Sequence, residues 1–318
     1  MAVDGWAPGC FSLGTDQAYP IYTYQTLRLL TIVDFPHSID LDLRAVLRVV
    51  IIIYSLHYAT LRTSSRPVDM VFSIMGLFRV ALNPKNFRAE DRLGATIALA
   101  RRILDKGGSP NWLACSLSLP SHPSISSFPD FPTTRVDSLA VYTVSNTGGT
   151  TEVDVATLMA DIDGWLGTED ITAATMDASG FLSFKAKSVP IEWTGECKPV
   201  VNDERGSTAY EDQILRFHSA ENAQGYMVSH DNKIWRIKTA ESETVHTGDG
   251  PIRAYAVVLG RMFTEMSTRF FDPGMLVRVI VLKEHADGML SRPGSGSWFT
   301  LNRISSHTDD WDERDFII

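Results

Sequence analysis

The sequence contains little cysteine: Cys10, Cys115 and Cys197 are the three cysteines among 318 residues. Three is an odd number, and no two of these residues lie close together in the sequence. This spacing indicates neither a disulfide framework nor a zinc site, because both need grouped cysteines. We therefore expect free thiols in a reducing compartment, and we predict a cytoplasmic protein.

Positive charge is also scarce. The 29 Lys and Arg residues are outnumbered by 38 Asp and Glu residues, which gives a formal net charge of -9. Non-specific binding to nucleic acid needs clustered Lys and Arg, and no basic stripe with interleaved aromatic residues is present, so we predict no nucleic-acid partner. The 44% hydrophobic content is typical of a globular chain, and the length is sufficient for a sizeable core and predicts two domains.

Long apolar runs are missing. Residues 1–20 lack the basic start and the continuous apolar stretch of a signal peptide. The best candidate for a membrane span, residues 49–61, has about 13 residues, whereas a spanning helix needs about 20. Extending it would bring Arg44 and Arg48 into the bilayer at high cost. We interpret it as a buried helix or strand; a further interpretation is that residues 1–60 are not the natural start of the protein.

Motifs for known chemistry are missing as well. The sequence has no G-x-S-x-G nucleophile elbow. Its Gly-rich stretches at 248–251 and 293–297 lack the Lys-Ser/Thr ending of a phosphate loop. We predict no bound cofactor.

What the sequence does contain is a helical hairpin over residues 62–108. Pro67 suits the first turn of a helix, with Ser64 or Ser65 as its cap. The apolar face of this first helix has spacings of three and four residues and consists of Met70, Val71, Ile74, Leu77 and Phe78. Asn83-Pro84 indicates where it has ended.

The second helix of the hairpin is expected to begin with Asn86 as its N-cap, followed by the acidic Glu90 and Asp91 in its early turns. Gly107-Gly108 predicts its end. Its apolar stripe consists of Leu93, Ile97, Ala100 and Leu104.

Residues 69–78, DMVFSIMGLF, resemble the D-x-V-Y-A-L-L-G-L segment near the end of fungal heterokaryon-incompatibility domains. The helix that follows and Trp112-Leu113 are similar to the region after that domain in mushroom proteins of the family, so the resemblance covers roughly residues 62–135. It implies a role in non-self recognition and programmed cell death, and a core related to the Toll/interleukin-receptor fold. The family's upstream blocks, S-Y-x-W-G and I-D-x-x-C-I-N-Q, are not found, so the chain resembles the end of such a protein.

The remainder of the chain is expected to be mainly β. Residues 109–135 form a Pro/Ser-rich connector in which Phe128 and Phe131 are spaced like anchors. A local helix is predicted at 151–159, and the acidic end of the chain is expected to be a solvated face. Strands are predicted at 139–144, 181–193, 226–228, 234–237, 254–259 and 276–282, with the last at 298–301.

We therefore predict an α+β fold, in which an N-terminal helical segment packs with a mainly antiparallel β C-terminal domain. The predicted division is a poorly defined segment 1–61, the hairpin 62–108, the connector 109–135 and a mainly β domain 136–318.

Two groups of residues are candidate sites. Glu284, His285 and Asp287 follow a buried strand and are of the types used in catalysis, although strand ends are polar in any case. His307, Asp309 and Asp310 could bind a cation, and the alternative is a solvated acidic surface.

Three interpretations of function remain open. The first is a non-catalytic interaction or regulatory protein of the heterokaryon-incompatibility type, with a protein partner. The second is a hydrolase-type enzyme with a His/acid site in the β domain. The third is a truncated remnant without activity of its own. The oligomeric state is not predicted.

Overall fold

The computed structural model describes residues 64, 66–110, 112–115, 117, 119–134, 140–146, 149–155, 165–166, 170–197, 226–238, 253–263, 276–285, 289–293, 297–302 and 307–318. All described residues belong to one compact unit. The predicted segment 1–61 and Asp287 lie outside the described residues, and the four-part division of the chain stays a prediction.

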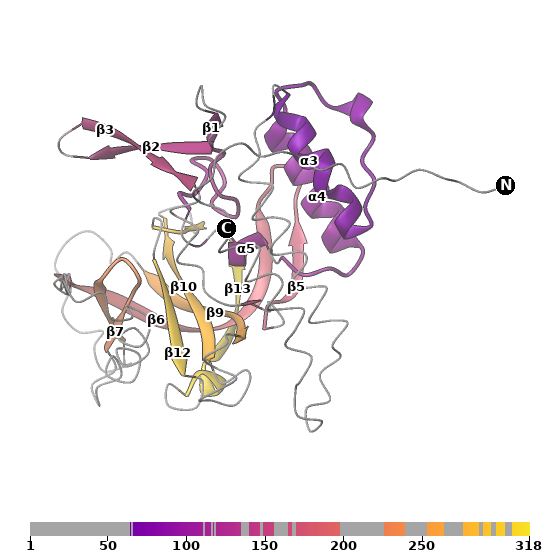
Figure 1. Cartoon of the computed structure of the whole chain (residues 1–318). Helices are drawn as coiled ribbons and strands as arrows, with labels where there is room; N and C mark the ends of the chain where they lie inside the picture. The colour runs from indigo at the N-terminus through magenta and orange to yellow at the C-terminus, as the bar shows by residue number, and fades with distance from the viewer. Residues whose placement is uncertain are drawn as a thin grey trace, which may run out of the picture. The chain divides into compact units, whose positions relative to one another are not determined.

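The described helices lie mainly in the predicted hairpin (Figure 1). The two longer ones, α3 and α4, pack against each other. The helical elements are α3 (Pro67–Met75), η1 (Gly76–Phe78), η2 (Pro84–Asn86), α4 (Arg92–Asp105), α5 (Trp112–Cys115) and η4 (Thr308–Asp310).

Helix α3 confirms the predicted first helix but not its cap. Pro67 is at the first helical position, and Met70 and Val71 are buried. The N-cap residue is Arg66, which makes no side-chain capping bond. Ser64 instead accepts a hydrogen bond from the Arg66 backbone N–H at 3.1 Å, so it shapes the approach to the helix.

Helix α4 begins later than predicted. Asn86 lies in η2, and Asp91 is the N-cap, accepting a hydrogen bond from the Gly94 backbone N–H at 3.0 Å. The predicted stripe is confirmed, with Ile97 among its buried members and Leu93 partly buried. The helix ends as expected, because Gly107 takes a left-handed φ of 76°.

Two sheets make up the rest of the described structure. The smaller one has the order β1-β2-β3, and the ten described strands of the larger one have the order β11-β10-β9-β6-β8-β7, with β12 on β10, β13 and β5 on β6, and β4 on β9. Every described pairing is antiparallel. The strands are β1 (Thr133–Thr134), β2 (Ala140–Asn146), β3 (Gly149–Asp154), β4 (Trp165–Leu166), β5 (Thr172–Met176), β6 (Leu182–Cys197), β7 (Tyr226–Val228), β8 (Lys233–Ile237), β9 (Ala254–Phe263), β10 (Leu276–Glu284), β11 (Leu290–Ser291), β12 (Trp298–Asn302) and β13 (Asp312–Ile317).

The larger sheet is apolar on both faces. Strand β10 is buried continuously from Leu276 to Leu282, as predicted for a strand covered on both sides. One face shares a core with the helical hairpin and the connector; among its members are Val71, Ile97, Ile103, Leu113, Phe128, Leu182, Phe184, Leu259, Ile280 and Phe316. The other face carries a separate inner cluster; among its members are Ile191, Met227, Trp235, Ala256, Val258, Val279, Val281, Phe299 and Leu301.

Helix, connector and sheet meet at Gly180, in the turn between β5 and β6. Its φ is 95°, and a Cβ there would lie 2.8 Å from the Ile125 side chain and 2.9 Å from that of Ile97. Ser127 donates a hydrogen bond to the Gly180 carbonyl at 3.1 Å. A residue without a side chain is therefore needed at this position for α4 and the connector to reach the sheet.

Two predictions for the β region need correction. Of the helix predicted at 151–159, residues 151–154 belong to strand β3, because β2 offers them a hairpin partner; Val155 is helical, and residues 156–159 lie outside the described residues. The strand at 298–302 is not the last one described, because β13 follows it and pairs with residues 183–188 of β6. In β13 the exposed acids Glu313 and Asp315 alternate with residues that face inward, so an acidic segment still contributes the buried Phe316 to the core.

The described residues are thus mainly antiparallel β sheet accompanied by α3 and α4, which agrees with the predicted α+β class. Within this part of the chain, no helix combines the length and apolar character needed to cross a bilayer.

Candidate functional site

His285 lies where strand β10 turns back into β11. Its side chain is exposed, its Nε2 atom is 2.5 Å from the Ser291 hydroxyl oxygen, and its backbone N–H donates to the Met289 carbonyl at 2.7 Å. The hairpin register places Glu284 opposite Leu290. The structure therefore brings His285 to Ser291, which is not among the site residues predicted from the sequence.

Glu284 is not part of that pair. Neighbouring residues of an extended strand point to opposite faces, so Glu284 is directed away from His285. Its Oε2 atom is buried and has no hydrogen-bond partner in the described part of the chain. His285 and Ser291 have the atoms of a nucleophile and its base, but Glu284 does not orient the imidazole.

The side chains of the second candidate group, His307, Asp309 and Asp310, point in two different directions. The His307 and Asp310 side chains are 78% and 81% exposed, with 3.7 Å between Nδ1 and Oδ2. Asp309 instead faces Lys187 of β6, whose Nζ lies 3.4 Å from the carboxylate and donates to the Asp309 carbonyl at 2.6 Å. Across the described residues, no group of three or more His, Cys, Asp or Glu side chains is arranged to hold a metal ion.

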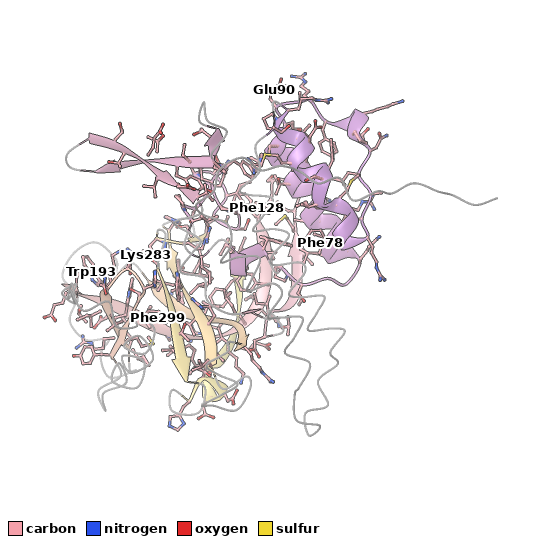
Figure 2. The ribbon with its side chains drawn as sticks, viewed as in Figure 1. Phe78, Glu90, Phe128, Trp193, Lys283 and Phe299 are labelled. Carbon is pink, nitrogen blue, oxygen red and sulfur yellow. The ribbon has the colours of Figure 1, made fainter. Side chains whose placement is uncertain are left out.

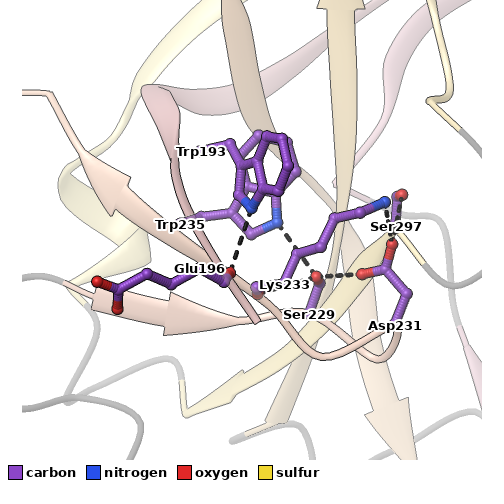
Figure 3. A network of polar contacts seen from close by, with 7 residues as sticks. All are labelled: Trp193, Glu196, Ser229, Asp231, Lys233, Trp235 and Ser297. Atoms are coloured by element: carbon purple, nitrogen blue, oxygen red, sulfur yellow. Dashed lines mark hydrogen bonds and ion pairs between the residues drawn. The ribbon is translucent and has the colours of Figure 1, made fainter. Parts of the chain in front are cut away.

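A polar network that the sequence did not indicate occupies the turn between β7 and β8 (Figure 3). The Ser229 hydroxyl donates to Asp231 and accepts from the Trp235 indole N–H at 3.1 Å. The other Asp231 oxygen lies 2.6 Å from Lys233 Nζ and accepts from the Ser297 hydroxyl at 3.4 Å. Because both oxygens of the carboxylate are engaged, the network is suited to fixing the turn. The Ser-x-Asp-x-Lys spacing at 229–233 is the signal that could have revealed it.

A second polar group anchors the connector. Arg292 is buried and donates to the Ser126 carbonyl at 2.9 Å and to the Phe128 carbonyl at 3.2 Å. The Tyr142 hydroxyl donates to the Asp130 carbonyl at 2.7 Å. The carbonyls of Ser126, Phe128 and Asp130 are thus bound by Tyr142 of β2 and by Arg292, which follows β11, and these hydrogen bonds hold the connector down.

The anchoring group has unusual electrostatics because it is removed from water. Burial lowers the pKa of Arg292 to about 10 and likewise that of Arg92, whose guanidinium lies 4.3 Å from the Phe131 ring centroid. Burial and then the Asp130 charge raise the pKa of Tyr142 above its ordinary value of 10.0. Arg292 and Tyr142 are buried and Arg92 is partly buried, and the contacts of all three groups indicate a structural role.

Trp193 is the most exposed large apolar side chain among the described residues. It lies near the outer end of β6 (Figure 2) and is 49% exposed, compared with 43% for Ile317 on β13. Its indole N–H donates to the Glu196 carbonyl at 3.2 Å. Gly195, with a φ of 84°, lets the chain turn between them, and a Cβ there would meet nothing within 4 Å. The tryptophan is therefore held in one position while it faces solvent.

Comparison with known proteins gives no match to a family model, a curated protein or a solved structure. The segment 69–78 that carries the family resemblance forms α3 and η1, where Val71 is buried and Phe72, Ile74 and Phe78 pack against the core. These residues have a packing role in this structure.

Proposed function

We propose that this protein is a non-catalytic interaction protein and that it binds a protein partner through the Trp193 tip, residues 193–197 at the end of β6. The observation that carries the proposal is the 49% exposure of a tryptophan whose indole N–H is already hydrogen-bonded to its own strand end. Tryptophan is enriched among the residues that dominate protein interfaces.

The fixed position of Trp193 favours binding for a physical reason. A large side chain that is already ordered loses little conformational freedom when a partner covers it, so more of its burial energy contributes to affinity. The charged pair of Glu192 and Arg236, with Lys238 at 3.8 Å from Glu192, lies on the opposite face of the same two strands, so it stays outside the surface that the partner would cover.

The resemblance of residues 69–78 extends the proposal to a biological role. We place the protein in the cytoplasm of a fungal cell, in non-self recognition of the heterokaryon-incompatibility type that leads to programmed cell death. The resemblance supports this role because its residues form an intact packed helix that can support a binding sheet.

The role is tested by inducible expression of the full chain in fungal hyphae, with cell death counted by a vital dye. The wild-type chain should change the death rate when unlike strains fuse, and Trp193→Ala should abolish that change. Ile317→Ala, which removes another exposed apolar side chain, should behave as the wild type. No effect of the wild-type chain on death in any fusion would reject the recognition role and favour a remnant without activity of its own.

One observation favours a hydrolase as the second candidate. The 2.5 Å contact between His285 Nε2 and the Ser291 hydroxyl would let the imidazole accept the serine proton as the oxygen attacks an ester carbonyl. A fluorophosphonate probe labels such an activated serine. Labelling that is lost in both Ser291→Ala and His285→Ala would establish this alternative, and an unlabelled wild-type chain would reject it.

A further inference from the structure

The two ends of the larger sheet meet without a strand ladder. Strand β7 ends the described order on one side, and β12 lies beyond β10 on the other. The sheet curls so that the backbone N–H of His230, just after β7, donates to the Trp298 carbonyl of β12 at 2.9 Å. In the described part of the chain no ladder pairs β7 with β12, so this seam is joined at the turn that follows β7.

The turn, residues 229–233, contacts β12 and the residue before it through side chains. The Ser297 hydroxyl donates to Asp231 across the seam at 3.4 Å (Figure 3). The His230 ring stacks on the Trp298 ring, with 4.3 Å between centroids and 12° between planes. The guanidinium of Arg278 lies 3.7 Å from the centroid of the same Trp298 ring. Among the described residues, the side-chain contacts of the turn with residues 297–302 therefore include one hydrogen bond and one ring stack.

Asp231 makes contacts both within the turn and across the seam. Its carboxylate is 19% exposed and contacts Ser229 and Lys233 within the turn as well as Ser297 beyond it. Asn232 beside it has a left-handed φ of 63°, which the hydrogen bonds around Asp231 help to hold. Loss of this carboxylate would loosen the turn and its contact with β12 together.

Apolar side chains lie directly behind the seam. Met227 and Trp235 are each 2% exposed and share the inner cluster with Phe299 and Leu301 of β12. Trp235 is also the register partner of Trp193 in β6. Separation of β7 from β12 would expose Met227 and Trp235 on strands next to the Trp193 tip.

We propose that residues 229–233 form a latch with Asp231 as the holding group, and that the sheet opens and closes between β7 and β12. Regions that open without unfolding of the whole protein are those held by few contacts. Among the described residues, this seam has fewer backbone hydrogen bonds than the ladders between β6, β9 and β10. The latch stands independently of the proposed function, because it concerns motion of the isolated chain.

Hydrogen exchange of the full chain, read by mass spectrometry, tests the latch. Asp231→Ala removes the holding group, and Ser297→Ala removes the side-chain hydrogen bond across the seam while leaving the turn intact. Both variants should accelerate exchange in residues 226–230 and 297–302, by about fivefold or more for Asp231→Ala. Exchange in the ladder of residues 254–258 with 279–283 should stay unchanged.

Asp177→Ala is the matched control. Asp177 holds a different turn, accepting from the Ser179 and Phe181 backbone N–H groups at 2.8 and 2.9 Å. This variant should leave exchange at the seam unchanged. The latch is wrong if Ser297→Ala leaves the seam at the wild-type rate, or if Asp231→Ala accelerates all strands of the sheet equally, which would indicate a general loss of stability.

Discussion

Tyr142 and Arg292 are polar side chains in apolar surroundings, and both are stabilised there by carbonyls of the connector. The sequence indicated that Phe128 and Phe131 anchor this segment, because their type and spacing are visible along the chain. It could not indicate Arg292, whose partners Ser126 and Phe128 are more than 160 residues away. At this scale, apolar burial is predictable from pattern, whereas a buried polar contact depends on the tertiary fold.

Tyr142 leads to a prediction for alkaline pH. Its pKa is raised in the folded protein by burial and by Asp130, so the unfolded chain loses the phenol proton first as the pH rises. The stability that it contributes is complete below pH 10 and declines above it, by at most about 1.4 kcal/mol per pH unit. Urea unfolding of the wild type and Tyr142→Phe between pH 8 and about 11 measures this.

The Tyr142→Phe variant should be less stable at pH 8 by about 1 kcal/mol, since it lacks the hydrogen bond to the Asp130 carbonyl. Above pH 10 its stability should decline less steeply than that of the wild type. Parallel pH profiles for the two proteins would show that the phenol is not protected by the fold.

Elements were predictable where a period is clear over several turns or residues. The hairpin helices and the continuous strand β10 were correct for this reason. The boundaries were less accurate, because Asn86 and Asp91 are both good caps by type and only the structure shows which one has a helix beginning after it.

The cap of α4 therefore gives a matched pair of variants. Asp91→Ala should lower the free energy of unfolding by about 1 kcal/mol, because the Gly94 backbone N–H loses its acceptor. Asn86→Ala, at the position favoured by the sequence, should change it by less than about 0.5 kcal/mol. Chemical denaturation of both variants decides between the two caps. A larger loss of unfolding free energy in Asn86→Ala than in Asp91→Ala would contradict the assignment of Asp91 as the N-cap of α4.

At the scale of the whole molecule, the sheet depends on strands far apart in the sequence. β6 pairs with β13, which lies more than 120 residues later, and no local pattern in the acidic segment predicts this pairing. The candidate sites have the same limitation. His285 was identified by residue type, but its partner Ser291 became visible only with the hairpin register, and the Trp193 tip only with the exposure of that side chain in the fold.

The role of β13 is tested by two neighbouring residues on opposite faces. Phe316 is 3% exposed, with its ring centroid 5.6 Å from that of Phe184, whereas Ile317 is 43% exposed. Phe316→Ala should cost about 3–5 kcal/mol in unfolding free energy through lost packing. Ile317→Ala should cost less than about 1 kcal/mol. Similar losses in urea denaturation would contradict the assigned register of β13.

Binding of a protein partner by the Trp193 tip can be measured in living cells. Proximity labelling in the native cells would compare wild type, Trp193→Ala and Ile317→Ala at equal expression. We expect a defined set of neighbours for the wild type, reduced by about tenfold or more in Trp193→Ala, as expected for an interface hot spot, and retained in Ile317→Ala. Equal labelling by wild type and Trp193→Ala would contradict binding through this tip.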